Sequence, residues 1–333
     1  FDTEKALEAI QYSMSWDTLK HFAGSGELVR NKLMSKAKYY EDKQGFIPSD
    51  QVNRSVSIAL EYAYNYWTVA IMAEDMGRQE IADEYFKKAK RYSTYFNPET
   101  GYMRGKNLDG SWLEPFHPRY ANHTGFDPYT EGNAWQWTWF VPHEVEGLAE
   151  LMGGRDAFSQ KLDSLFSVSS EVLGEHAGGD ITGLIGQYAH GNEPSHHIAY
   201  MYNEVDKPWR TQEVVSQILD EFYTDQPDGL CGNEDCGAMS AWYILSSMGF
   251  YPMCPGDVRY SIGRPSFDEV KIMLENGKLF TIRAENRSAD NPYVQEVRLN
   301  GEKLMEPYIT HGDIESGATL EFVMGPEKKV YYN

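Results

Sequence analysis

Three short turns of this chain carry carboxylates, and each turn leads into a run of aromatic or histidine residues. The turns are Glu131-Gly132-Asn133, Gly191-Asn192-Glu193 and Gly232-Asn233-Glu234-Asp235. Gly and Asn accept the turn conformations that let a side chain project from a loop. A carboxylate that precedes a helix is also stabilised by the unpaired N–H groups of the first turn. Carboxylates can transfer protons and flat rings can stack on sugar faces, so the pattern points to cleavage of glycosidic bonds.

The first turn places Glu131 just before Trp135, Trp137 and Trp139. Apolar surroundings favour the protonated carboxyl that a general acid needs, which makes Glu131 a candidate for that role. The alternative is that Glu131 only caps the helix that follows it. The three tryptophans cannot all face one way on a helix, so at least one should pack in the core. Trp135 and Trp137 are candidates for stacking against a sugar.

The second turn offers ligands for two different metals. His190, Glu193 and His196 follow one another at three-residue intervals, and this set could bind zinc. A proline directly after Glu193 interrupts the helix that would align them, however. The oxygen atoms of Asn192 and Glu193 resemble instead a site for a hard cation such as calcium, although a purely hydrogen-bonded turn is an alternative. His196 and His197 are candidates for contacts with sugar hydroxyls.

The third turn sets Glu234 and Asp235 side by side before a predicted helix, with Asp228 shortly before them. Adjacent carboxylates repel each other, so one can keep a proton or bind a cation while the other acts as a base. Capping of the helix is again the alternative. All three carboxylates are therefore candidate catalytic residues.

The chain up to about residue 254 reads as helices separated by long loops. Apolar residues at helical spacing over residues 51–76 and 78–95, with Gly77 between them, predict a helical hairpin. A small turn-centred hairpin is predicted between Tyr95 and Arg104. Further helices are predicted at residues 132–152 (which Pro142 should kink or split), 154–173, 195–204, 208–223 and 236–249.

Residues 255–333 change to short alternating strands, and Asn300-Gly301 is a strong hairpin turn. We therefore predict a mainly α chain, in which residues 1–254 form part of an α/α toroid of helical hairpins. A small C-terminal antiparallel β module, similar to a β-sandwich, is predicted over residues 255–333.

The composition limits the partners of the chain. Its 333 residues have a formal net charge of −20, which disfavours nucleic acid and anionic membranes as partners. No apolar run is long enough to span a membrane. The 3 cysteines do not indicate a disulfide scaffold. The chain starts with Phe1 and not with Met, as a processed protein or a fragment would.

Taken together, these motifs resemble glycoside hydrolase family 92, the calcium-dependent exo-acting α-mannosidases. The resemblance rests on the run from Gly191 to His197 and on the run from Gly232 to Pro252, in that order. The segments Tyr129-Thr130-Glu131-Gly132 and Pro208-Trp209-Arg210-Thr211-Gln212 add to it. It extends over essentially the whole chain, including the β tail.

The resemblance implies an (α/α)6 catalytic domain and inverting hydrolysis of α-mannosidic linkages in mannose-containing glycans. It makes Glu131 the general acid and Asp235 the general base, with Glu234 or Asp228 as the fallback for the base. It also assigns a calcium ion to Asn192 and Glu193.

Family members are longer than this chain and begin with a β-sandwich domain. The chain therefore resembles a C-terminal portion whose expected partner is that N-terminal domain. The resemblance also implies a bacterial protein that is secreted, periplasmic or attached to the cell surface.

Two other functions are compatible with the same residues. One is a non-catalytic glycan-binding scaffold, in which the rings and acids only hold sugar. The other is a zinc-dependent hydrolase that uses His190, Glu193 and His196. The sequence does not fix which mannosidic linkage is cleaved.

Overall fold

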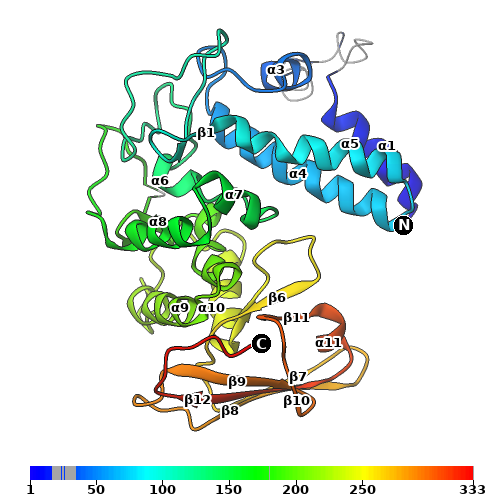
Figure 1. Cartoon of the computed structure of the whole chain (residues 1–333), viewed down its shortest axis with the longest axis vertical. Helices are drawn as coiled ribbons and strands as arrows, with labels where there is room; N and C mark the ends of the chain where they lie inside the picture. The colour runs from blue at the N-terminus through cyan, green and yellow to red at the C-terminus, as the bar shows by residue number, and fades with distance from the viewer. Residues whose placement is uncertain (17–23, 25, 27–34, 180, 333) are drawn as a thin grey trace. The chain divides into compact units, whose positions relative to one another are not determined.

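A computed structural model describes residues 1–16, 24, 26, 35–179 and 181–332 of the chain (Figure 1). The chain forms two compact units. Unit 1 comprises Phe1–Met152 and Val168–Gly179, and unit 2 comprises Gly153–Ser167 and Asp180–Asn333. The expected boundary between residues 254 and 255 falls inside unit 2.

Unit 1 is built mainly from helices (Figure 1). They are α1 (Thr3–Met14), α3 (Lys36–Gln44), α4 (Ser55–Asp75), α5 (Gln79–Ala89), the 3₁₀ helix η1 (Lys90–Tyr95), α6 (Ala134–Trp137) and α7 (Val145–Leu151). Strand β1 (Phe96–Asn97) pairs with β2 (Tyr102–Met103) in antiparallel fashion. This pair confirms the small hairpin predicted between Tyr95 and Arg104.

Helices α4 and α5 confirm the helical hairpin predicted from the spacing of apolar residues. The chain turns at Gly77, whose φ of 69° is a left-handed conformation that glycine adopts without steric cost. Tyr66 and Ala70 of α4 pack with Tyr85 of α5 in a buried cluster that Leu7 of α1 joins. The hydrophobic faces of three helices are thereby buried against one another.

The helix predicted over residues 132–152 is split in the structure. Helix α6 ends at Trp137, helix α7 begins at Val145, and Pro142 lies between them. A proline inside a helix removes a backbone donor and clashes with the preceding turn. The predicted effect of Pro142 is thus confirmed.

Unit 2 combines helices with short strands. Its helices are α8 (Arg155–Ser167), the 3₁₀ helices η2 (Glu193–Ser195) and η3 (Ile198–Val205), α9 (Pro208–Phe222), α10 (Ala238–Met248) and α11 (His311–Glu315). Its strands are β3 (Leu184–Ile185), β4 (Tyr188–Ala189), β5 (Phe250–Tyr251), β6 (Arg259–Ile262), β7 (Glu269–Met273), β8 (Leu279–Glu285), β9 (Tyr293–Leu299), β10 (Glu302–Lys303), β11 (Tyr308–Thr310) and β12 (Thr319–Gly325). The helix predicted at residues 195–204 is a 3₁₀ helix in the structure.

The main sheet of unit 2 has five strands in the order β10-β9-β12-β8-β7. The predicted hairpin turn at Asn300-Gly301 joins β9 to β10, and both residues have positive φ. Strand β12 pairs antiparallel with β9 but parallel with β8. The sheet is therefore mixed, which corrects the prediction of a purely antiparallel module. Strand β12 follows β10, β11 and α11 in the chain, and it enters the sheet between β8 and β9.

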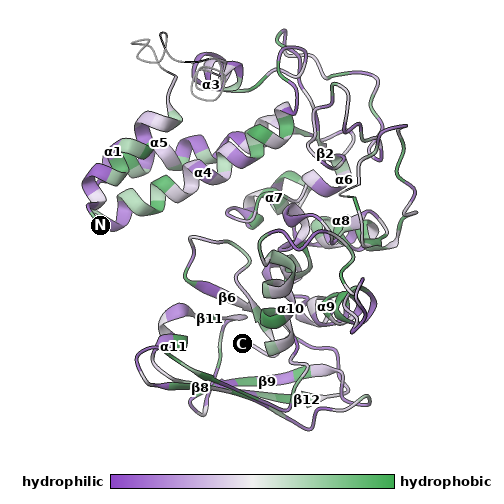
Figure 2. Cartoon of the chain, turned by 180° about the vertical axis from the view of Figure 1, so that it is seen from behind, coloured by the Kyte–Doolittle hydropathy of each residue, from purple (hydrophilic) through white to green (hydrophobic). Residues whose placement is uncertain are grey.

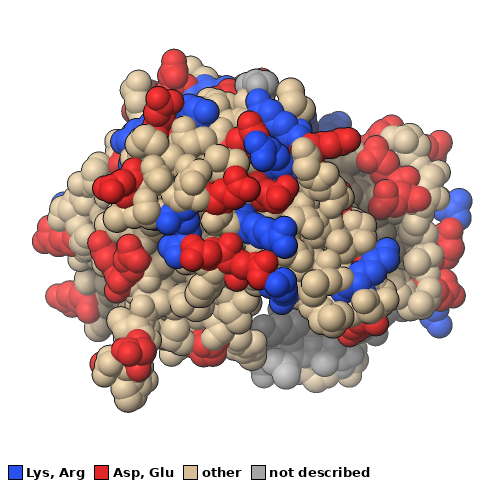
Figure 3. All heavy atoms as spheres, turned by 90° about the horizontal axis from the view of Figure 1, so that it is seen from below, with Lys and Arg blue, Asp and Glu red and all other residues tan. Residues whose placement is uncertain are grey.

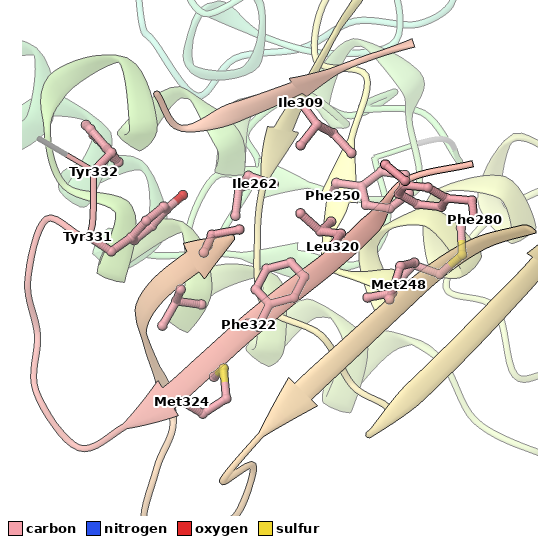
Figure 4. Close-up of a cluster of buried hydrophobic side chains, with 14 residues drawn as sticks. Met248, Phe250, Ile262, Phe280, Ile309, Leu320, Phe322, Met324, Tyr331 and Tyr332 are labelled. Atoms are coloured by element: carbon pink, nitrogen blue, oxygen red, sulfur yellow. The ribbon is translucent and has the colours of Figure 1, made fainter. Parts of the chain in front are cut away.

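The core of unit 2 lies between this sheet and the end of α10 (Figure 4). Phe280 and Phe322 of the sheet are fully buried with Phe250, and Met248 closes the cluster from the helix. Figure 2 shows hydrophobic residues along α10 and along the strands of the sheet. Burial of each large apolar side chain contributes about 1.5–3 kcal/mol. The β module therefore packs within unit 2, against the helix that follows the third acidic turn.

Charged side chains of both signs are interspersed on the face seen in Figure 3. Ion pairs such as Lys271–Glu269 and Arg298–Glu296 join neighbouring charges on the strands. In the described part of the chain, none of the helices is both long and apolar enough to cross a membrane.

Candidate functional site

Glu131 lies in unit 1, in the turn before α6, but it is not the residue that caps this helix. The cap is Asn133, whose side-chain oxygen accepts hydrogen bonds from the N–H groups of Trp135 and Gln136. Gln136 in turn accepts a hydrogen bond from the N–H of Asn133 at 2.7 Å. These two bonds form a capping box. The structure therefore does not support helix capping as the role of Glu131.

Two of the predicted catalytic carboxylates have a left-handed backbone. The φ of Glu131 is 47° and the φ of Asp235 is 49°. This conformation costs an L-residue about 1–2 kcal/mol, and it persists where the surroundings enforce it, often at functional sites. Other residues of the chain share it, including Asn286 and Asn300, whose short amide side chains tolerate it better. Arg54 and Cys236 also have positive φ without such tolerance, so this conformation is shared by Glu131 but does not by itself mark a catalytic residue.

The three tryptophans after Glu131 lie in different surroundings. Trp139 is fully buried, as expected of the one that packs in the core, but Trp137 and Trp135, the candidates for stacking against a sugar, are buried as well, at 3% and 8% exposed. Trp135 contacts the edge of Tyr102, with ring centroids 5.1 Å apart. The indole N–H of Trp137 donates to the carbonyl oxygen of Thr130 at 2.7 Å. Trp137 is thereby held against the turn that carries Glu131.

Trp137 and Thr130 line a hollow of about 580 Å³, together with Glu61 and Tyr62 of α4. Burial raises the pKa of Glu61 to about 7, because the ionised carboxylate is poorly solvated there. A carboxyl with a strongly shifted pKa in a hollow is a candidate functional group. The sequence analysis did not identify Glu61. The signal that could have revealed it is an acid in the middle of the apolar pattern of residues 51–76, away from Glu74 and Asp75 at its end.

The second acidic turn lies in unit 2, beside a buried chain of hydrogen bonds centred on His190. The hydroxyl of Tyr223 donates to the carbonyl oxygen of Met239, so it accepts the N–H of His190 Nε2 at 2.7 Å. His190 Nδ1 then accepts a hydrogen bond from the hydroxyl of Tyr188 at 2.8 Å. His190 is 0% exposed, and burial lowers its pKa to about 2. The imidazole is therefore neutral and fixed in one tautomer.

This network contradicts the zinc site predicted from His190, Glu193 and His196. Both ring nitrogens of His190 are engaged by tyrosine hydroxyls. His196 Nε2 lies 3.0 Å from the carbonyl oxygen of His190 and donates to it. Within the residues that the structure describes, no group of three or more His, Cys, Asp or Glu side chains is arranged to hold a metal. The rings of His190 and His196 instead pack against each other, with centroids 5.1 Å apart, while the side chain of Glu193 is exposed.

Asn192 and Glu193 begin the 3₁₀ helix η2, with the side chain of Asn192 buried and that of Glu193 exposed. His196 and His197, predicted to contact sugar, are both buried. Burial lowers the pKa of His196 to about 4, although the negative charge of Asp235 opposes this shift.

Glycines bring the backbones of these two turns into contact. A Cβ atom built on Gly232 would lie 2.9 Å from the Cα atom of Gly191, so only glycine fits at position 232 without displacement. Thr182 lies against the same two glycines. The structure thus places Asn192 and Glu193 in the same part of unit 2 as Glu234 and Asp235.

The carboxylates of the third turn differ in what they do. Glu234 accepts hydrogen bonds from the N–H and the hydroxyl of Ser240 at 3.1 and 3.0 Å, so it stabilises the first turn of α10. Asp235 and Asp228 are exposed. Beside this turn, Tyr223 and Tyr243 line a hollow of about 340 Å³. The structural role of Glu234 favours Asp235 over Glu234 as the group available for catalysis.

The predicted site is therefore divided between two parts of the structure. Unit 2 brings together Asn192, Glu193, Glu234 and Asp235. Glu131, with Trp135 and Trp137, belongs to unit 1. Convergence of all these residues on one pocket stays a prediction.

Comparison with known proteins assigns the chain to a family. The model of the glycosyl hydrolase family 92 catalytic domain matches residues 1–326. The chain is 38% identical to the family GH92 alpha-mannosidase BT3965 from Bacteroides thetaiotaomicron, solved in complex with mannoimidazole. That match covers 98% of this chain and 41% of the other, with a TM-score of 0.85.

Two further relatives agree with this assignment. The family GH92 inverting mannosidase BT2199 from Bacteroides thetaiotaomicron is 35% identical, with a TM-score of 0.82, over 100% of this chain and 46% of the other. An uncharacterized secreted glycosidase from Arthroderma benhamiae is 29% identical over 316 residues, which are 85% of this chain and 38% of that protein. The chain therefore spans less than half the length of each of these relatives.

Proposed function

The chain belongs to glycosyl hydrolase family 92, and on this premise we propose that it is the C-terminal portion of an inverting exo-α-mannosidase acting on mannose-containing glycans. The observation that carries the proposal is the family match over residues 1–326. The similarity to an alpha-mannosidase and to an inverting mannosidase supports the substrate class and the stereochemistry. The resemblance inferred from the acidic turns is in agreement.

In the proposed reaction Glu131 is the general acid and Asp235 is the general base. Glu131 donates a proton to the glycosidic oxygen as the bond to the anomeric carbon breaks. Asp235 takes a proton from the water that attacks this carbon from the opposite face, so the configuration is inverted. The engagement of Glu234 by Ser240 and the exposure of Asp235 support the choice of Asp235 over Glu234 as the base. Asp228 is the fallback for the base.

We further propose that Asn192 and Glu193 hold a calcium ion. Their side chains offer an amide oxygen and a carboxylate, and calcium binds oxygen ligands of both kinds. This donor set fits calcium better than zinc, which prefers imidazole and thiolate. The bound ion would supply positive charge that orients hydroxyls of the mannose. His196 and His197, in the same turn, would bound the pocket that receives the sugar.

The remaining parts of the proposal concern the whole protein. The chain spans 41% of its mannosidase neighbour BT3965. From the family resemblance of the sequence motifs we propose that the parent protein also contains an N-terminal β-sandwich domain. The helices of both units would belong to an (α/α)6 toroid. Similarity to a secreted glycosidase supports a secreted protein, and a periplasmic or surface-attached location in a bacterium stays a prediction from the family resemblance.

The proposal is tested by offering the intact protein a panel of α-linked mannose disaccharides. We expect release of mannose. NMR should show that the released mannose first appears as the β anomer, the inverted configuration relative to the α-linked substrate. Mannose that first appears with retained configuration contradicts inversion. Binding of mannosides without release favours a non-catalytic glycan-binding scaffold instead.

The roles of the two carboxylates are tested by matched variants. General acid catalysis contributes about 10²–10⁴-fold, so Glu131→Gln should lower kcat on a disaccharide by about that factor and have far less effect on aryl mannosides with good leaving groups. Asp235→Asn should slow both substrates similarly, because activation of water does not depend on the leaving group. Equal losses on both substrates for Glu131→Gln would show that Glu131 is not the acid.

A further inference from the structure

The segment of chain that leads into Glu131 is attached to the first turn of helix α4. The carbonyl oxygen of Pro128 accepts hydrogen bonds from the N–H groups of Val56 and Ser57, at 3.0 and 3.3 Å. The first N–H groups of a helix have no partner within the helix itself, so they need an acceptor from elsewhere. In this chain the segment before Glu131 supplies that acceptor, and it is thereby fixed to the start of α4.

A buried hydroxyl of the same helix holds the residue directly before Glu131. The N–H of Thr130 donates to Ser57 Oγ at 2.8 Å, and Ser57 is only 2% exposed. The carbonyl oxygen of Thr130 accepts the indole N–H of Trp137 at 2.7 Å. Both backbone polar groups of Thr130 are therefore hydrogen-bonded, one to α4 and the other to α6. Water competes little with hydrogen bonds at buried positions, so this peptide is held in one orientation.

The guanidinium of Arg54 joins the same loop at three points. Its Nη1 atom donates to the carbonyl oxygens of Tyr129 at 2.7 Å and of Asn122 at 2.9 Å. Its Nη2 atom donates to the carbonyl oxygen of His123 at 2.6 Å. A guanidinium presents its donors in a rigid planar fork, and hydrogen bonds from a charged donor are stronger than neutral ones. Arg54 therefore ties two separate stretches of the loop to the start of α4.

Such attachment matters for a general acid, because a proton can be transferred only over hydrogen-bonding distance. A misplacement of about 1 Å can lower the rate about 10²-fold. The φ of 47° at Glu131 is unfavourable for an L-residue, so its surroundings must hold the backbone in this conformation. The contacts of residues 128–130 with α4 are the part of those surroundings that lies immediately before Glu131 in the chain.

We propose that Ser57 and Arg54 are positioning residues for the general acid. They fix the backbone of residues 129 and 130, and this backbone directs the carboxyl of Glu131 at the glycosidic oxygen. They act through Glu131 and not through contact with the substrate. The inference rests on the proposed function, in which Glu131 protonates the leaving group.

Two variants of the intact protein weaken the attachment in different ways. Ser57→Ala removes one hydroxyl and leaves the N–H of Thr130 without this acceptor. Arg54→Lys keeps the positive charge but loses the planar fork. The matched control is Ser55→Ala, on the same helix, where a buried hydroxyl lies 2.6 Å from Ser49 Oγ. Thermal unfolding of each variant checks that the fold is retained.

The readout is kcat on an α-linked mannose disaccharide, compared with kcat on an aryl mannoside that has a good leaving group. We expect Ser57→Ala to lower kcat on the disaccharide about tenfold, and Arg54→Lys to lower it about tenfold to 100-fold. The aryl mannoside should be affected little, because its leaving group departs without a proton from the acid. Ser55→Ala should change neither value.

A double variant separates positioning of the acid from a merely structural role. Residues that act through one another have non-additive effects on the rate. In a protein that already carries Glu131→Gln, the further change Ser57→Ala should therefore cause no additional loss on the disaccharide. An additional tenfold loss in this background would overturn the inference, because Ser57 would then act independently of the acid.

The outcomes also distinguish this inference from the proposed function. If Glu131→Gln slows only the disaccharide, while Ser57→Ala and Arg54→Lys keep full activity or slow both substrates equally, the positioning role is wrong and the function stands. If both variants are unfolded at the assay temperature, the contacts with α4 are structural and the inference is overturned. If the unsubstituted protein releases no mannose from any substrate, the proposed function fails and the positioning role fails with it.

Discussion

Replacement of Glu61 by glutamine should stabilise the protein at alkaline pH. Burial raises the pKa of Glu61 from the ordinary 4.5 to about 7. The folded state therefore binds this proton more tightly than the unfolded chain between these two values. Stability falls as the pH rises through this window and stays lowered above it. At 1.36 kcal/mol per pKa unit, the cost of the ionised carboxylate is at most about 3 kcal/mol.

Glutamine has nearly the same shape as glutamate but cannot ionise, so Glu61→Gln avoids this cost. Urea unfolding followed by circular dichroism gives the free energy of unfolding at pH 5 and at pH 8. We expect the variant to differ little from the unsubstituted protein at pH 5 and to be more stable at pH 8, by up to about 3 kcal/mol. The control is Glu80→Gln, an exposed position on the neighbouring helix α5. A gap of the same size at both pH values, or a variant less stable at pH 8, would refute the reasoning, because it would mean that the Glu61 carboxylate is solvated or paired.

Three further predictions concern the metal, the contact between turns and a buried histidine. Removal of calcium by a chelator should abolish mannoside hydrolysis, and full activity in chelator would count against Asn192 and Glu193 as ligands. Gly232→Ala should cost about 1–3 kcal/mol in urea unfolding, because the added Cβ meets backbone at 2.9 Å, whereas Gly179→Ala adds a Cβ to open space and should change little. Burial lowers the pKa of His143 from 6.5 to about 4, so the unfolded state binds more protons in this window and stability is lost as the pH falls through it. His143→Gln, which can still donate to a carbonyl of α5, should remove up to about 3 kcal/mol of the acid sensitivity measured between pH 7 and 4; an unchanged sensitivity would show that the surrounding rings stabilise the imidazolium.

Local patterns in the sequence were sufficient to predict much of the secondary structure. The apolar spacing over residues 51–95 predicted the α4–α5 hairpin, and Pro142 predicted the break between α6 and α7. Asn300-Gly301 predicted the β9–β10 turn. These features depend on backbone conformations and on one apolar face per element, and both are encoded within a few neighbouring residues. The family was predicted from the same local runs of residues, and the comparison confirmed it.

The tertiary structure decided what each carboxylate is able to do. The sequence alone did not tell whether Glu234 caps a helix and Asp235 stays exposed, because this depends on the position of Ser240. It likewise did not establish that Glu61 loses its solvation, or that β12 enters the sheet beside β8. Solvation and strand pairing are set by groups that are distant in the chain and close in space. For this reason the sequence determined the elements and the candidate acids, and only the folded chain determined which acids are buried, which are engaged and which are available.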